Sequence, residues 1–137
     1  MAAPMAAFAT PRTDPSIDEL KGRLSSAGVG DKPRICIEIA QKQLVETDKL
    51  YAADQGEKAQ GPLTDVVSYS ELARDYSIQS RKHQKQTEIA AREITRKLND
   101  ILHTLSHEEQ TPIRNAINRM QRVRDDMLMS MFPKGIK

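Results

Sequence analysis

The regular spacing of apolar residues constrains the fold of this chain more than any other feature. In its clearest segment, small or apolar residues recur at alternating steps of four and three from Thr87 to Leu105, which is the seam of a helix packed in a bundle. Similar stripes run from Ile37 to Tyr51, from Leu63 to Ser77 and from Ile113 to Met131. The spacing therefore predicts four long helices and no strand.

Prolines and glycines mark the expected boundaries of the first two long helices. Asp31 can cap a helix N-terminus and Pro33 fits a first turn, so the first long helix is expected to begin near residue 31. It should run to about Asp54, before a glycine. Gly61 and Pro62 then open the second long helix.

The last two boundaries rest on weaker signals. No glycine or proline occurs between Leu63 and Thr111, a span too long for one globular helix, so a turn must form from ordinary polar residues. We place that turn near Ser80. Thr111, as a cap, and Pro112, in a first turn, predict the start of the last helix.

These segments predict an all-α fold, an antiparallel up-down four-helix bundle over residues 31–133. Residues 1–30 are expected to be a flexible tail, over residues 1–13, followed by a short capped helix with its proline in the first turn. That helix has a thin apolar stripe and is expected to dock only weakly. Within the second long helix, small residues predict a close crossing with a neighbour, at Ser70, Ala73 and Ser77.

Composition supports one aliphatic-cored domain. The chain has 137 residues, about the length of a single domain, and aromatic residues make up only 4%, so leucine, isoleucine, valine, alanine and methionine must fill the core. Net charge is +2, which is weaker than a dedicated nucleic-acid binder usually shows. Residues 1–80 carry −3 and residues 81–137 carry +5. This favours complementary charge between packed helices, with a basic binding face as the alternative.

The sequence gives little support to catalysis, and we expect no cofactor. Cys36, the single cysteine, lies among apolar residues and is expected to be buried and structural. Asp100, His103 and His107 have helical spacing but group about 160–220° from the centre of the apolar stripe, so they face solvent rather than a metal. His83 is also expected at the surface, although a phosphotransfer histidine stays open as an alternative. An enzyme site assembled at the ends of the bundle is a further alternative.

A run of basic residues forms a candidate anion-binding face on the third long helix. Acidic residues such as Glu88 and Glu93 interrupt it and no aromatic residue accompanies it, so a solvated face is favoured over a nucleic-acid site. The candidate residues are Arg81, Lys82, Lys85, Arg92, Arg96 and Lys97.

A methionine-rich stretch near the C-terminus is the candidate interface for a protein partner or a second copy. Met127 and Met131 continue the core stripe, whereas Met129 and Phe132 lie off it. Simple closure of the core and a self-association patch both remain open.

Several helix-face residues give the chain a resemblance to small bacterial all-helical proteins without an assigned function. The residues that carry it are Ile39, Ala40, Gln43, Leu44, Asp48, Tyr51, Asp65, Val66, Val67, Tyr69, Glu88, Ile89, Arg92, Arg96, Leu98, Asp100 and Ile101. The resemblance covers residues 33–133. It implies a four-helix-bundle-like fold and no particular activity.

The leading hypothesis is a non-enzymatic helical interaction or structural module, with binding of an anionic ligand or nucleic acid as its rival. No stretch approaches the roughly 20 apolar residues of a membrane span. The N-terminus lacks the basic and apolar regions of a signal peptide. We therefore favour a cytoplasmic protein, and the mature form of an exported protein stays open.

Overall fold

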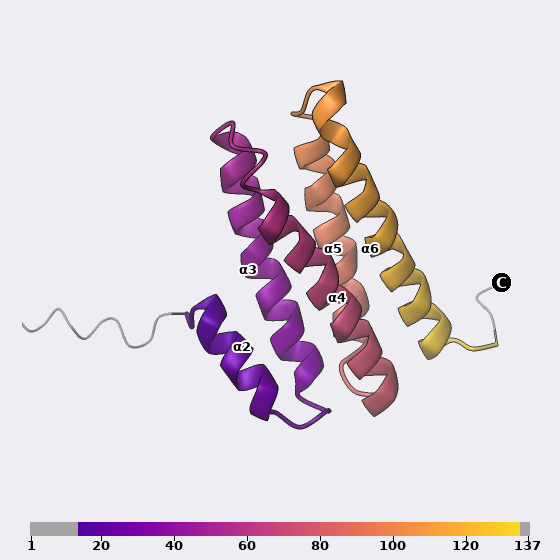
Figure 1. Ribbon diagram of the computed structural model, residues 1–137. Coiled ribbons are helices and arrows are strands. Elements are labelled where there is room, and N and C mark those ends of the chain that lie inside the picture. Colours follow the sequence, from indigo (N-terminus) through magenta and orange to yellow (C-terminus); the bar gives the residue numbers. More distant parts are fainter. Residues whose placement is uncertain (1–13, 135–137) are drawn as a thin grey trace, which may run out of the picture.

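The computed structural model describes residues 14–134, and this part of the chain consists of helices joined by short connections (Figure 1). The elements are α2 (Ile17–Ser26), α3 (Lys32–Ala52), α4 (Gln60–Ser80), α5 (Gln84–Leu102), the 3-10 turn η2 (His107–Glu109) and α6 (Gln110–Met131). The predicted all-α class is confirmed. The tail predicted over residues 1–13 lies outside the described residues.

The predicted turn near Ser80 is confirmed, but two predicted caps are wrong. Asp31 precedes α3 with helical backbone angles instead of the extended ones of a capping residue, and its side chain makes no capping hydrogen bond. Thr111 lies inside α6, because the chain enters this helix directly from η2 with Glu109 at the N-cap position. At the N-termini of α3 and α6, the residue before the helix therefore already has a helical backbone and provides no side-chain cap.

The α4–α5 connection contains two non-glycine residues in the left-handed region, Arg81 with φ 63° and His83 with φ 60°. A side chain makes this conformation costly, whereas glycine adopts it freely. We expect His83→Gly to raise the free energy of unfolding by about 0.5–1 kcal/mol in urea titrations. Lys82→Gly is the matched control, because Lys82 does not have positive φ, and it should not stabilise. Equal effects of the two changes would contradict this explanation.

Consecutive long helices form two antiparallel hairpins. In the first, Gln43 of α3 donates to Asp65 of α4 at 2.8 Å, and Gln60 at the start of α4 donates to the Tyr51 hydroxyl near the end of α3 at 2.9 Å. In the second, Gln84 at the start of α5 donates to Ser130 at the end of α6 at 2.7 Å. The pairing runs in opposite directions in both hairpins.

The two hairpins meet mainly through α4 and α6, which run in the same direction. Between α4 and α6, Glu71 pairs with Arg119 at 2.7 Å and Arg74 pairs with Asp126 at 3.2 Å, so the residue numbers rise together. Between the described parts of α3 and α6 there is no close approach, while α3 lies beside α5. The predicted arrangement as an antiparallel up-down bundle is therefore not confirmed.

A close approach of α4 to α5 lies where the small residues of the sequence predict it. Ser70, Ala73 and Ser77 of α4 are all buried, and the Ser77 hydroxyl lies 2.8 Å from the Thr87 hydroxyl of α5. Around this crossing, aliphatic residues of α3 to α6 form one core cluster that includes Val66, Ile94, Leu98, Ile113, Met120 and Val123.

The short helix α2 packs on the long helices through a single fully buried leucine, and how strongly it docks stays a prediction. It begins after Ser16, which forms a capping box with Glu19, and not with a proline in its first turn. Leu20 is completely buried against Ile35 and Ile39 of α3. Ile17, Leu20 and Leu24 have the spacing i, i+3 and i+7 and lie on one face of α2. All three pack in this cluster. The predicted domain boundary at residue 30 stays a prediction.

Candidate interaction surfaces

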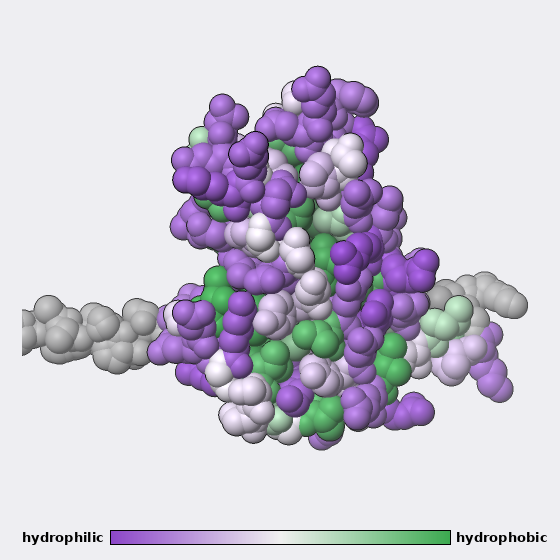
Figure 2. Space-filling view, viewed as in Figure 1, coloured by the Kyte–Doolittle hydropathy of each residue, from purple (hydrophilic) through white to green (hydrophobic). Residues whose placement is uncertain are grey.

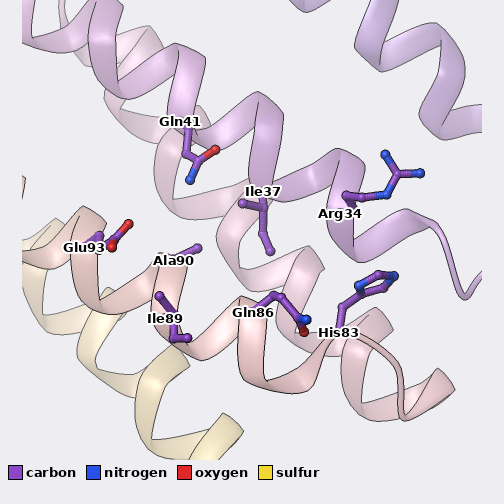
Figure 3. A pocket seen from close by; sticks show the side chains of 8 residues that line it. All are labelled: Arg34, Ile37, Gln41, His83, Gln86, Ile89, Ala90 and Glu93. Atoms are coloured by element: carbon purple, nitrogen blue, oxygen red, sulfur yellow. The ribbon is translucent and has the colours of Figure 1, made fainter.

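An apolar-floored groove runs along the surface between α3 and α5, and we call it the α3–α5 groove. Its first section has a cavity volume of about 280 Å³. The residues that line it are Arg34, Ile37, Gln41, His83, Gln86, Ile89, Ala90 and Glu93. Figure 3 shows Ile37 projecting from α3 toward α5, and His83 projecting from the start of α5 toward α3. Aliphatic side chains form the floor, and polar groups stand at its rims.

The groove continues toward the other end of the two helices. Gln41 and Glu93 also line a second section of about 470 Å³, which reaches the ion pair between Asp48 and Lys97 at 3.4 Å. Val45 stands on its α3 side with 55% of its surface exposed. From residue 34 to residue 48 the α3 wall is about 21 Å long at 1.5 Å per residue. This length accommodates four turns of a docked helix.

The basic face predicted on α5 is divided by the structure. The Arg92 guanidinium pairs with Glu88 at 2.6 Å and Lys97 pairs with Asp48 at 3.4 Å, so both bind carboxylates of this chain. The exposed residues Arg81 and Lys82 belong to the α4–α5 connection rather than to a helix face. The six predicted cations are therefore not brought together in one site.

Two of those cations lie on the same face of α5 as Ile89, but neither lines the groove. Lys85 and Arg96 are exposed and lie four residues before and seven residues after Ile89, which places the three side chains on one face of α5. Arg34 stands on the opposite wall, at the end near His83. The groove thus combines an apolar floor with a rim of mixed charge, on which Arg34 and Lys97 stand with Glu93 and Asp48.

Glu88, which the sequence presented as one of the acids of a solvated face, is a buried carboxylate. Only 4% of its side chain is exposed, and it binds Arg92 of its own helix and Arg124 of α6 at 2.6 and 3.3 Å. Desolvation alone would raise the pKa of this carboxyl. The hydrogen bonds and charges of the two guanidinium groups outweigh it, and they hold the pKa below its ordinary value. The cluster joins the two helices of the second hairpin.

The methionine-rich end is only partly a surface. Met127 is completely buried, because it faces the core beside Val123 on the same stripe. It therefore does not belong to the candidate interface. Met131 is half-buried. Met129 and Phe132 are 61% and 52% exposed, as their positions off the stripe predict.

A third exposed apolar residue lies near this end of the molecule. Ile78 of α4 is 40% exposed and follows Arg74, the partner of Asp126, by one helical turn. Figure 2 shows hydrophobic surface over the lower parts of α4 and α6, whereas the upper end is almost entirely hydrophilic. Ile78, Met129 and Phe132 together are called the apolar end patch.

Other sequence predictions concern chemistry. Cys36 is buried, as predicted, and desolvation raises the pKa of its thiol to about 12, with Lys32 acting in the opposite direction. Within residues 14–134, no three side chains of His, Cys, Asp or Glu come together in a way that could hold a metal ion. Over the same residues, no helix is both long and apolar enough to cross a membrane.

The groove could not be recognised from the main apolar stripe of each helix, because residues off that stripe line it. Ile89 lies well off the stripe of α5, and Val45 off that of α3, and these isolated aliphatic residues were the available signal. The burial of Glu88 also had a signal in the sequence. Thr95 follows it by seven residues, so two polar side chains lie along the same edge of the apolar stripe, and both are buried.

Comparison with known proteins adds no relative to this description. No protein-family model, no curated protein and no solved structure matches the chain.

Proposed function

We propose that this chain is a non-enzymatic helical interaction module that binds an amphipathic helix of a partner protein in the α3–α5 groove. In this proposal the scaffold is a four-helix bundle built from two antiparallel hairpins, and the groove is the seam where α3 and α5 run side by side. The apolar floor of both sections, formed by Ile37 and Ile89 in the first and by Leu44 and Ile94 in the second, is the observation that carries the proposal. Helix-in-groove recognition needs such a floor, with polar rims that set the register.

Helix α2 offers an internal precedent for this binding mode. The residues of α2 at i, i+3 and i+7 pack on α3, with Leu20 against Ile35 and Ile39. Tyr69 of α4 also packs in that cluster, so α2 covers the α3–α4 side of α3. The α3–α5 side carries half-buried aliphatic residues without such a cover within the described chain. A partner helix would complete α3 in the same way.

Charge on the rim defines the partner helix further. Arg34 at one end of the groove, together with Lys85 and Arg96 on the α5 surface next to Ile89, favours acidic side chains beside the apolar stripe of the bound helix. Glu93 favours one basic residue near the middle. The expected ligand is therefore a helix with apolar residues at i, i+3 or i+4 and i+7, and mainly acidic flanks.

A selection of displayed helical peptides against the intact chain tests the proposal. Selected peptides should share that spacing and bind the Ile89→Glu variant at least about tenfold more weakly, because a carboxylate would be buried in the apolar contact. Ile78→Glu is the matched control, since this exposed isoleucine lies on α4 outside the groove. Peptides that bind both variants equally well would refute groove binding.

Ionic strength separates this function from the rival anion-binding function. A contact dominated by the apolar floor should keep its affinity between low and high salt, within about threefold, because only rim charges are screened. Binding of inorganic polyphosphate or single-stranded nucleic acid through Arg81, Lys82 and Lys85 would instead weaken steeply. Isothermal titration with a selected peptide and with polyphosphate compares the two directly.

Self-association through the apolar end patch is a second candidate, favoured by the exposure of Met129 and Phe132. If it occurs, the mass from light scattering should exceed that of one 15.4 kDa chain and be independent of salt. Met129→Ser with Phe132→Ser should return the chain to a monomer. Both residues are more than half exposed, so these changes leave buried Met127 in place. A monomeric wild-type chain at every concentration would exclude this role.

A further inference from the structure

We infer that residues 1–13 of this chain bind in cis to the α3–α5 groove and compete there with the partner helix. The inference takes from the proposed function only the identity of the groove. It concerns regulation, because an attached segment lowers the apparent affinity of any partner that uses the same surface.

The position of Asp14 favours this occupant of the groove. Asp14, where the described part of the chain begins, pairs with Lys42 of α3 at 3.5 Å. A depression at this place is lined by Asp14 to Ile17 on one side and by Gln41 and Val45 on the other. Gln41 and Val45 also line the α3–α5 groove. The segment that precedes Asp14 therefore starts at the rim of the groove.

The segment that precedes Asp14 is long enough to span the groove. Thirteen residues span up to about 45 Å when extended. The α3 wall of the groove from residue 34 to residue 48 measures about 21 Å. A tethered segment of this length reaches either end of the groove, and the tether supplies a high effective concentration.

The composition of this segment suits an apolar surface. Residues 1–9 contain no charged side chain and include Met1, Met5 and Phe8. Apolar residues in such a segment favour an apolar surface, and methionine adapts to an irregular one. Arg12, the only charged residue before Asp14, has Glu38 as a carboxylate near the same depression.

A paramagnetic label in the full-length chain tests the inference. Ala9→Cys introduces a site for a nitroxide, and Cys36 does not compete because it is completely buried with a raised thiol pKa. We expect loss of the methyl signals of Ile37 and Ile89, while those of Ile78 and Ile113 persist. The added changes Met5→Ser and Phe8→Ser should restore the two lost signals without moving the label.

The alternative outcomes are distinct. Uniform or absent broadening would overturn the inference, and so would broadening that appears only when labelled chains are mixed with unlabelled chains, because docking would then be between molecules. Peptide binding in the groove together with no broadening would remove the competition and leave the proposed function intact. Broadening at Ile37 and Ile89, together with a helix selection that yields no binding peptide, would support docking of residues 1–13 and remove the proposed function.

Discussion

Replacing Leu98 with alanine should lower the free energy of unfolding by about 2–5 kcal/mol, enough to threaten the folded state of a domain of this size. Leu98 is completely buried on α5, in the cluster that also contains Ile94 and Ile101. Removing its side chain takes away buried apolar surface and leaves a cavity that close-packed helices fill only in part. Urea denaturation followed by circular dichroism measures the change.

Val45→Ala is the control for the leucine change. It removes an aliphatic side chain from α3, but this side chain is 55% exposed, so the cost should stay within about 0.5 kcal/mol. Similar losses in the two variants would mean that Leu98 does not lie in a packed core.

Replacing Glu88 with alanine should destabilise the chain by about 1–3 kcal/mol. The change removes a buried carboxylate and its hydrogen bonds to Arg92 and Arg124. The expected loss stays below that of an uncompensated buried charge, because both guanidinium groups are partly exposed and can turn to water. Glu46→Ala, at an exposed position of α3, is the control and should have little effect.

The same cluster gives stability a dependence on acid pH. Since folding lowers the pKa of Glu88, its contribution is fully present above the pKa of the unfolded chain. It is lost as the pH falls from that value through the lower pKa of the folded state. Glu88→Gln should therefore be less stable than wild type at neutral pH and should show a flatter decline below about pH 4.5. Parallel declines in the two proteins would contradict the lowered pKa.

The helices could be predicted from the sequence because the buried residues of each helix recur at helical spacing. The stripe from Thr87 to Leu105 and the glycine- and proline-bounded segments correspond to α3 through α6, and even the turn after Ser80 follows from length alone. Small residues at Ser70, Ala73 and Ser77 predicted the close crossing, since only small side chains allow such an approach.

The pairing of the hairpins could not be predicted in this way. Periodicity tells which face of a helix is buried, but not which neighbour covers it or in which direction that neighbour runs. The parallel contacts of α4 with α6 depend on residues far apart in sequence, such as Glu71 and Arg119. The α3–α5 groove is a product of that pairing, so Ile37 and Ile89 gained their role only in three dimensions.

Site-specific photo-cross-linking tests the central claim, that the α3–α5 groove is the binding surface. A photoreactive amino acid replaces Gln86, an exposed residue that lines the groove, or Gln121, an exposed residue of α6. A peptide from the helix selection is then bound to each protein and irradiated. We expect covalent capture of the peptide from position 86 and none from position 121. Capture from position 121, with none from position 86, would contradict it.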